Sequence, residues 1–123
     1  MTIARLESIA SRIVRDTLTS LPPVIRQEAD ACRIDLVDMA EALDAEDDLD
    51  PDLLGLFEGN ARCDPLPAAP NEMPRIRLFL DNLWDESEGH LETFREEVRI
   101  TLLHELGHYL GLDEAQVAAL GLA

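Results

Sequence analysis

The chain has 123 residues, which is enough for one domain with its own core, spanning residues 1–123, but not for a second lobe of ordinary size. Its 26 acidic residues outnumber its 10 basic ones, and the net charge of −16 repels nucleic-acid phosphates and anionic membrane surfaces. No apolar run approaches the roughly 18 residues of a membrane span, and the first residues lack the apolar segment of a signal peptide. We therefore expect a cytoplasmic protein in which Cys32 and Cys63 stay reduced, with neither nucleic acid nor a membrane as partner.

The first third of the chain predicts two helices and a strand. Pro22 and Pro23 end the first helix, residues 3–19, and residues 24–31 add a helical turn or two. Polar and apolar residues alternate in CRIDLVDMA, which predicts a strand at about 33–39. The first helix is amphipathic because its apolar side chains recur at spacings of three and four: Ile3, Leu6, Ile9, Ala10, Ile13, Val14 and Thr17.

An acidic stretch, a short apolar segment and a proline-rich segment follow. The stretch EALDAEDDLDPDLL, residues 41–54, lacks the ligand spacing and central glycine of a calcium loop, so it predicts a solvated connection without chemistry. The segment LLGLFEG, residues 53–59, predicts a short strand closed by glycine. Residues 60–74 contain four prolines and predict a turn-rich loop that could border a cleft.

The segment RIRLFL predicts the next strand. Alternation places Ile76, Leu78 and Leu80 on one face, which indicates a strand with one buried face. Arg75 and Arg77 either help an acidic peptide to dock or balance a very acidic protein. The second interpretation is favoured, because charged side chains are ordinarily surface groups without a special role.

A long helix is expected near the end of the chain. Residues 81–90 predict a connection in which His90 lies alone, and the helix then runs from about 91–93 to 110. Thr93 and Glu96 have the spacing of a capping box. Beyond Val98 the helix is apolar on nearly all sides, which predicts burial. Histidines on such a helix need partners, since each unpaired buried polar group costs roughly 1–3 kcal/mol, and a metal ion would supply them.

His104, Glu105 and His108 on this helix complete the His-Glu-x-x-His pattern. Side chains four residues apart lie on the same helical face, so both imidazoles can reach one metal ion. Glu105 is rotated by about 100° around the axis and flanks the metal position instead of filling a ligand place. This is where a base for metal-activated water belongs.

The residues after His108 predict that the chain turns back towards the two histidines. Gly111 stands where a helix can end in a left-handed residue. Asp113 and Glu114 then offer a carboxylate as third ligand. Asp113 and Gln116 have the spacing of a reciprocal N-cap for a short last helix, DEAQVAAL, which would occupy Asp113 and leave Glu114 free. Asp113 stays the alternative ligand.

The segment HELGHYLGLDE resembles the extended zincin pattern, His-Glu-x-x-His-x-x-Gly-x-x followed by a third ligand. Together with LLGLFEG and the short chain, it resembles the small bacterial zincin-like metallopeptidases of the minimal-zincin type, which commonly carry aspartate where this sequence has Glu114. The resemblance implies an α/β (α+β) fold with an N-terminal helix, a small mixed sheet of about three strands, an active-site helix and a short C-terminal helix. It also implies that an edge strand pairs with the substrate backbone.

The motif and the resemblance predict a zinc-dependent metallopeptidase that hydrolyses peptides or proteins through metal-activated water. One Zn²⁺ ion would be held by His104, His108 and Glu114, with Glu105 as base. This ligand set suits zinc, although it also accepts other first-row ions. Tyr109 is a candidate oxyanion donor, but a packing role is favoured. The alternative function is a weakly active or inactive zincin scaffold that binds metal and a protein partner; the oligomeric state is left open.

Overall fold

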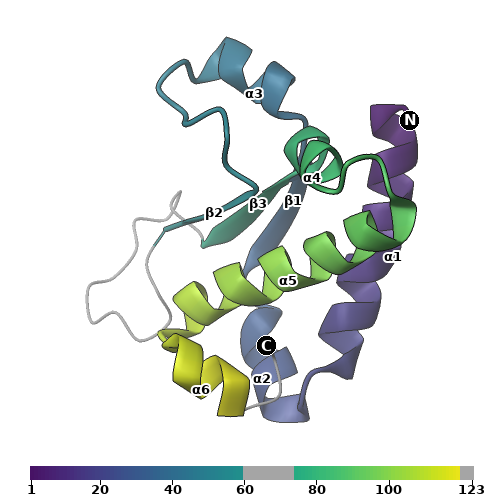
Figure 1. The fold of residues 1–123 in the computed structure, drawn as a ribbon. Coiled ribbons are helices and arrows are strands. Elements are labelled where there is room, and N and C mark those ends of the chain that lie inside the picture. Colours follow the sequence, from purple (N-terminus) through teal and green to yellow (C-terminus); the bar gives the residue numbers. More distant parts are fainter. Residues whose placement is uncertain (60–73, 120–123) are drawn as a thin grey trace.

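The structure, a computed structural model, describes residues 1–59 and 74–119. Within these residues the expected α+β fold with a small mixed sheet is confirmed, and Figure 1 shows the long helix α5 crossing one face of the sheet. The elements follow in the order α1 (Ile3–Ser20), α2 (Pro23–Ala29), β1 (Arg33–Val37), α3 (Met39–Ala45), β2 (Gly55–Glu58), β3 (Arg75–Phe79), α4 (Leu80–Glu86), α5 (Leu91–Leu110) and α6 (Glu114–Ala119).

The sheet has the strand order β1-β3-β2, so β3 is central and β1 and β2 are the two edges. β1 runs parallel to β3, and β2 runs antiparallel to it. Ile76 and Leu78 of β3 are fully buried in the core that α5 covers. The expectation that β3 has only one buried face is wrong, because Arg77 and Phe79 are also buried. On this second face Glu46 and Glu58 pair with the Arg77 guanidinium, which lies over the Phe79 ring with 5.7 Å between the guanidinium carbon and the ring centroid.

The core lies between the sheet, α1 and α5. The apolar face predicted for residues 3–19 is confirmed, since Leu6, Ala10 and Thr17 of α1 are buried and the rest of that face is partly buried. Helix α5 supplies the largest share of the core, including Phe94, Val98, Leu102, Leu103, Leu106 and Leu110. Among the described residues, no helix combines the length and apolar character that crossing a membrane requires.

Two segments expected to be connections contain helices. Helix α3 lies at the start of the acidic stretch, where the carboxylate of Asp81 accepts hydrogen bonds from the backbone N–H groups of Met39 (2.8 Å) and Ala40 (3.2 Å). These N–H groups have no partner within their own helix, so Asp81 stabilises its first turn. Helix α4 lies in the expected connection 81–90, and it is anchored by the fully buried Leu80 and Leu83.

Other boundaries also differ from expectation. The strand predicted at 33–39 ends at Val37 because α3 begins at Met39. The capping box of Thr93 and Glu96 is wrong: α5 begins at Leu91, and His90, which was expected to lie alone in a loop, is its N-cap residue without a side-chain cap bond. The proline-rich segment 60–73 lies outside the described residues, and so does Cys63. Cys32 is a buried free thiol, and burial raises its pKa to about 11, so it is protonated at neutral pH.

Candidate metal centre

His104 and His108 lie one helical turn apart near the C-terminal end of α5. Their Nε2 atoms are 3.2 Å apart, and their rings are nearly perpendicular, with centroids 4.8 Å apart. One possible ligand atom from each of His104, Glu105 and His108 lies within 4.8 Å of the other two. The spacing of four residues therefore brings both ring nitrogens to one point, as the motif predicts.

The two imidazoles fit a tetrahedral zinc ion. Zinc–nitrogen bonds measure about 2.0–2.1 Å, so two ligands of one tetrahedral ion lie about 3.3 Å apart. The 3.2 Å separation of the two Nε2 atoms matches this edge, and the nitrogen donors suit zinc. The residues present thus fit the metal that the motif predicts.

The predicted burial of the two histidines is wrong. Both side chains are exposed, whereas Glu105 between them is only 9% exposed. From Val98 to Leu110, the residues of α5 are buried or half-buried except for one strip formed by Ile100, which is 46% exposed, His104 and His108. The cost of burying unpaired imidazoles therefore does not argue for a metal here. The 3.2 Å separation of the two Nε2 atoms is the observation that supports a metal.

Glu105 belongs to α5, and its side chain lies between this helix and the edge strand β2. A Cβ atom placed on Gly55 of β2 would lie 3.3 Å from Cγ of Glu105 and 2.6 Å from Cγ2 of Thr101. The absence of a side chain at Gly55 therefore allows the strand backbone to approach the helix beside the motif. Sequence analysis missed this contact; its only signal was a glycine inside an apolar strand.

Helix α5 ends as the glycine pattern predicts. Gly111 has φ 72°, in the left-handed region. Its N–H bonds back to His108 O, and the N–H of Leu112 bonds to Gly107 O at 2.9 Å, which together form a Schellman-type ending. The chain then reverses into α6, which packs against α5 (Figure 1).

The reciprocal cap of the last helix is confirmed. The N–H of Gln116 donates to Oδ1 of Asp113 at 2.7 Å, and the N–H of Asp113 donates to Oε1 of Gln116 at 2.9 Å. Asp113 is thus engaged as a cap, as expected. Glu114 is the first residue of α6, but its side chain lies outside the described part of the structure. Its role as third ligand stays a prediction.

Gly107, inside the motif, has a packing role that sequence analysis did not assign. A Cβ atom on Gly107 would lie 2.9 Å from Cγ2 of Val117 in α6. The missing side chain lets α6 fold against α5 one residue before His108. The signal was present, because glycine in a helix interior costs about 1 kcal/mol relative to alanine and so requires a reason.

Tyr109 is buried, and its ring packs on Phe57 of β2 with the centroids 5.8 Å apart. This agrees with the favoured packing role. Together with Gly55, Phe57 shows that β2 runs beside the segment of α5 that carries the motif. The edge strand and the two histidines therefore border the same region of the surface.

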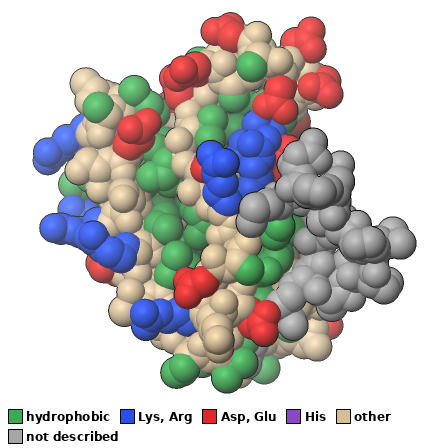
Figure 2. All heavy atoms as spheres, turned by 180° about the vertical axis from the view of Figure 1, so that it is seen from behind, with side chains coloured by type: hydrophobic (Ala, Val, Ile, Leu, Met, Phe, Trp, Pro, Cys, Tyr) green, Lys and Arg blue, Asp and Glu red, His purple; other side chains and the backbone are tan. Residues whose placement is uncertain are grey.

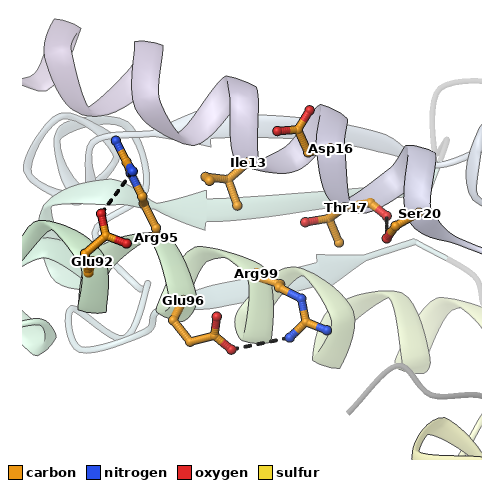
Figure 3. A pocket seen from close by; sticks show the side chains of 8 residues that line it. All are labelled: Ile13, Asp16, Thr17, Ser20, Glu92, Arg95, Glu96 and Arg99. Carbon is orange, nitrogen blue, oxygen red and sulfur yellow. Dashed lines mark hydrogen bonds and ion pairs between the residues drawn. The ribbon is translucent and has the colours of Figure 1, made fainter.

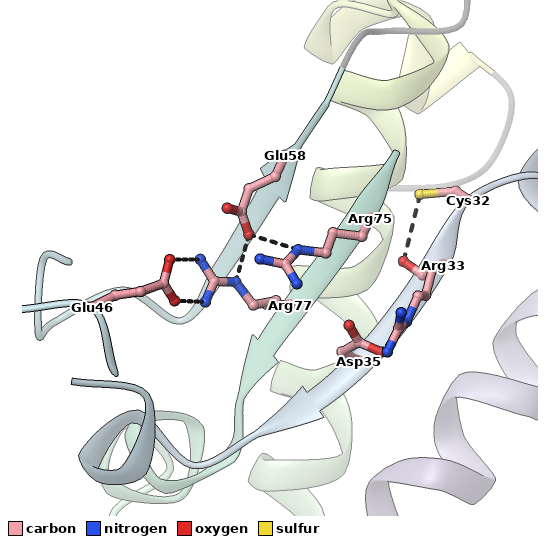
Figure 4. A network of polar contacts seen from close by, with 7 residues as sticks. All are labelled: Cys32, Arg33, Asp35, Glu46, Glu58, Arg75 and Arg77. Carbon is pink, nitrogen blue, oxygen red and sulfur yellow. Dashed lines mark hydrogen bonds and ion pairs between the residues drawn. The ribbon is translucent and has the colours of Figure 1, made fainter. Parts of the chain in front are cut away.

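Arg75 and Arg77 are held by acids of the same chain. Figure 4 shows the Arg77 guanidinium between Glu46 and Glu58, with Arg75 also reaching Glu58 at 3.2 Å. Burial alone would lower the pKa of Arg77, but the two carboxylates raise it above its ordinary value, and Arg77 in turn lowers the pKa of Glu46. These contacts support the interpretation that both arginines balance local acids. Arg77 also ties β2 to the segment after α3.

A hollow of about 260 Å³ between α1 and α5 lies away from the motif (Figure 3). Its charged groups on α5 are paired with one another: Arg95 with Glu92 at 3.0 Å and Arg99 with Glu96 at 3.4 Å. Because these pairs follow the i, i+3 spacing of an exposed helix face, they indicate a solvated surface.

Comparison with known protein families agrees with the candidate metal site. A search among curated proteins finds no match for this chain. The family model described as "Zincin-like metallopeptidase" matches residues 30–122, which include the sheet, α5 and α6. The match covers the His-Glu-x-x-His motif and the edge strand beside it. The chain belongs to the zincin-like metallopeptidase family.

Proposed function

We propose that this protein is a zinc-dependent endopeptidase that hydrolyses peptide bonds in short or unfolded peptides. The observation that carries the proposal is the 3.2 Å separation of the Nε2 atoms of His104 and His108, with a carboxylate oxygen of Glu105 within 4.8 Å. One zinc ion would be held by the two histidines and by Glu114. Membership of the zincin-like metallopeptidase family supports this assignment.

The protein groups have separate roles in the proposed reaction. When bound, zinc supplies a Lewis acid for the scissile carbonyl and for the attacking water. Glu105 accepts the proton of that water and passes it to the leaving amine. Within the described chain its carboxylate has no hydrogen bond or ion pair, so its lone pairs are available for this transfer. The exposed histidines leave the site open to a substrate.

We assign substrate alignment to β2. This strand is an edge of the sheet, and Gly55 and Phe57 place it beside the motif helix. A peptide that adds to a sheet edge gains main-chain hydrogen bonds, with alternate side chains directed into neighbouring pockets. Docking on β2 would bring the scissile bond next to the two histidines. The partner of this site is accordingly a peptide or an unfolded protein segment.

The variant Glu105→Gln tests this function. The amide cannot accept the proton but keeps nearly the same shape, so we expect zinc binding to persist while hydrolysis of a fluorogenic peptide library falls by at least about 10²-fold. Glu97→Gln is the matched control, since it removes one acid from the same helix outside the motif. Hydrolysis that survives in Glu105→Gln with zinc retained would contradict the proposal. Absence of cleavage in both wild type and control would favour a non-catalytic scaffold.

A further inference from the structure

The second edge of the sheet, strand β1, lies in a groove distant from the motif. An open hollow of about 490 Å³ follows β1 and is bordered by residues of α3 and β3. A second hollow of about 450 Å³ lies between β1 and α1. The two hollows share Glu7 and Leu36, so they adjoin along the strand. Figure 2 shows hydrophobic side chains between α1 and the sheet, with acidic side chains gathered over α3.

The outer edge of β1 has backbone groups available for a further strand. The N–H of Arg33 donates to Pro74 O next to β3 at 3.0 Å. Because amide directions alternate along a strand, the N–H groups of Ile34 and Leu36 point away from β3. No backbone hydrogen bond joins these two residues to a further strand in the part of the chain that the structure describes. Such an edge is a template for strand addition.

The charges around this groove select the partner. Arg75 and Arg77 line the groove, but Glu46 and Glu58 already neutralise them. Glu7 on α1 and Glu41 on α3 line the groove, and neither forms an ion pair with a described residue. The uncompensated charge at the rim is therefore negative. A second copy of this chain would bring like charges together, whereas a basic segment would be attracted.

We propose that β1 docks an extended basic segment of a partner protein, which adds to the sheet as a fourth strand. The backbone of the partner pairs with Ile34 and Leu36, and its basic side chains lie near Glu7 and Glu41. The half-buried side chains of Ile34, Leu36 and Val37 provide apolar contact for the residues between. This surface is separate from β2, so docking on β1 leaves the proposed peptidase site open.

Amide hydrogen exchange with a synthetic probe tests the proposal. The probe is a short peptide of alternating lysine and valine, mixed with the zinc-loaded Glu105→Gln variant of the full chain so that it is not consumed. We expect exchange of the Ile34 and Leu36 amides to slow by at least about tenfold, because these N–H groups become hydrogen bonded. The same peptide with N-methylated valines, which cannot donate at those positions, should give no protection.

A charge variant separates strand addition from general attraction to an acidic protein. Glu7→Gln combined with Glu41→Gln should weaken binding of the lysine peptide about fivefold. Asp16→Asn combined with Asp30→Asn removes the same charge away from the groove and should change binding less than twofold. The proposal is overturned by equal weakening in both double variants, by protection at other amides instead of Ile34 and Leu36, or by equal binding of a glutamate–valine peptide. Protection that arises without peptide through self-association, seen by sedimentation, would also overturn it.

Discussion

Gly55 of the edge strand and Glu105 of the motif helix approach so closely that a methyl group on Gly55 would lie 3.3 Å from Glu105 Cγ. The same methyl group would lie 2.6 Å from Thr101 Cγ2, a separation that side chains do not tolerate. One glycine therefore fixes how closely the proposed substrate strand lies to the proposed base. This relationship links the fold directly to the chemistry of the site.

Gly55→Ala should destabilise the protein by about 1–3 kcal/mol, because the added methyl group overpacks the contact between β2 and α5. It should also reduce peptidase activity, since the strand moves away from Glu105. Urea unfolding and peptide hydrolysis measure the two effects. Adding Thr101→Ser removes the Cγ2 atom and should recover most of the lost stability. A double variant as unstable as the single one would show that the contact with Thr101 does not set how closely β2 packs on α5.

Gly107→Ala should weaken zinc binding about tenfold, while the free energy of unfolding changes by no more than about 1 kcal/mol. Alanine favours the interior of α5, but its methyl group pushes Val117 and thus α6, whose first residue is the proposed ligand Glu114. Competition with a chromophoric chelator measures the zinc affinity. Val117→Ala in the same chain should restore it. Unchanged zinc affinity in Gly107→Ala would show that the position of α6 does not affect zinc binding.

The third ligand can be assigned with a matched pair of variants. Glu114→Gln and Asp113→Asn each remove one negative charge, and asparagine is as good an N-cap as aspartate. Because Asp113 is engaged with Gln116, we expect Asp113→Asn to bind zinc nearly as the wild type does. Glu114→Gln should lower the affinity at least about 100-fold. The reverse order of affinities would assign the ligand to Asp113.

The ion pair between Arg77 and Glu46 should give a pH-dependent contribution to stability. Arg77 lowers the pKa of Glu46 below its ordinary value of 4.5, so this contribution is present above pH 4.5 and is lost as the pH falls through the folded-state pKa. Wild type should therefore be more stable than Glu46→Gln at pH 7, and the difference should vanish at low pH. Urea unfolding of both proteins across this range measures it; a difference independent of pH would contradict the assignment.

Features that depend on neighbours in the sequence could be predicted. The amphipathic face of α1, the end of α5 at Gly111 and the reciprocal cap between Asp113 and Gln116 all arise within a few residues of chain. The spacing of His104 and His108 belongs to the same class, because helical geometry alone sets their mutual position. Local sequence rules therefore predicted the relative position of the two histidines at the centre of the candidate site.

Features that depend on distant segments could not be predicted. Helix α3 is stabilised at its start by Asp81, more than 40 positions away in the sequence. Arg77 is buried between Glu46 and Glu58, two acids from distant segments whose approach no periodicity reveals. The burial assigned to the histidines was wrong for a related reason: apolar composition says how much of a helix is covered, but tertiary packing decides which strip stays open.

Zinc content after dialysis measures whether His104 and His108 hold a metal ion. Wild-type protein and the double variant His104→Ala with His108→Ala are loaded with excess zinc, dialysed and analysed for bound metal, with circular dichroism to verify that both are folded. The exposure of the two side chains means that their removal should leave the fold intact. We expect close to one zinc ion per wild-type chain and none per folded double variant. Equal zinc content in the two proteins, or none in the wild type, would contradict it.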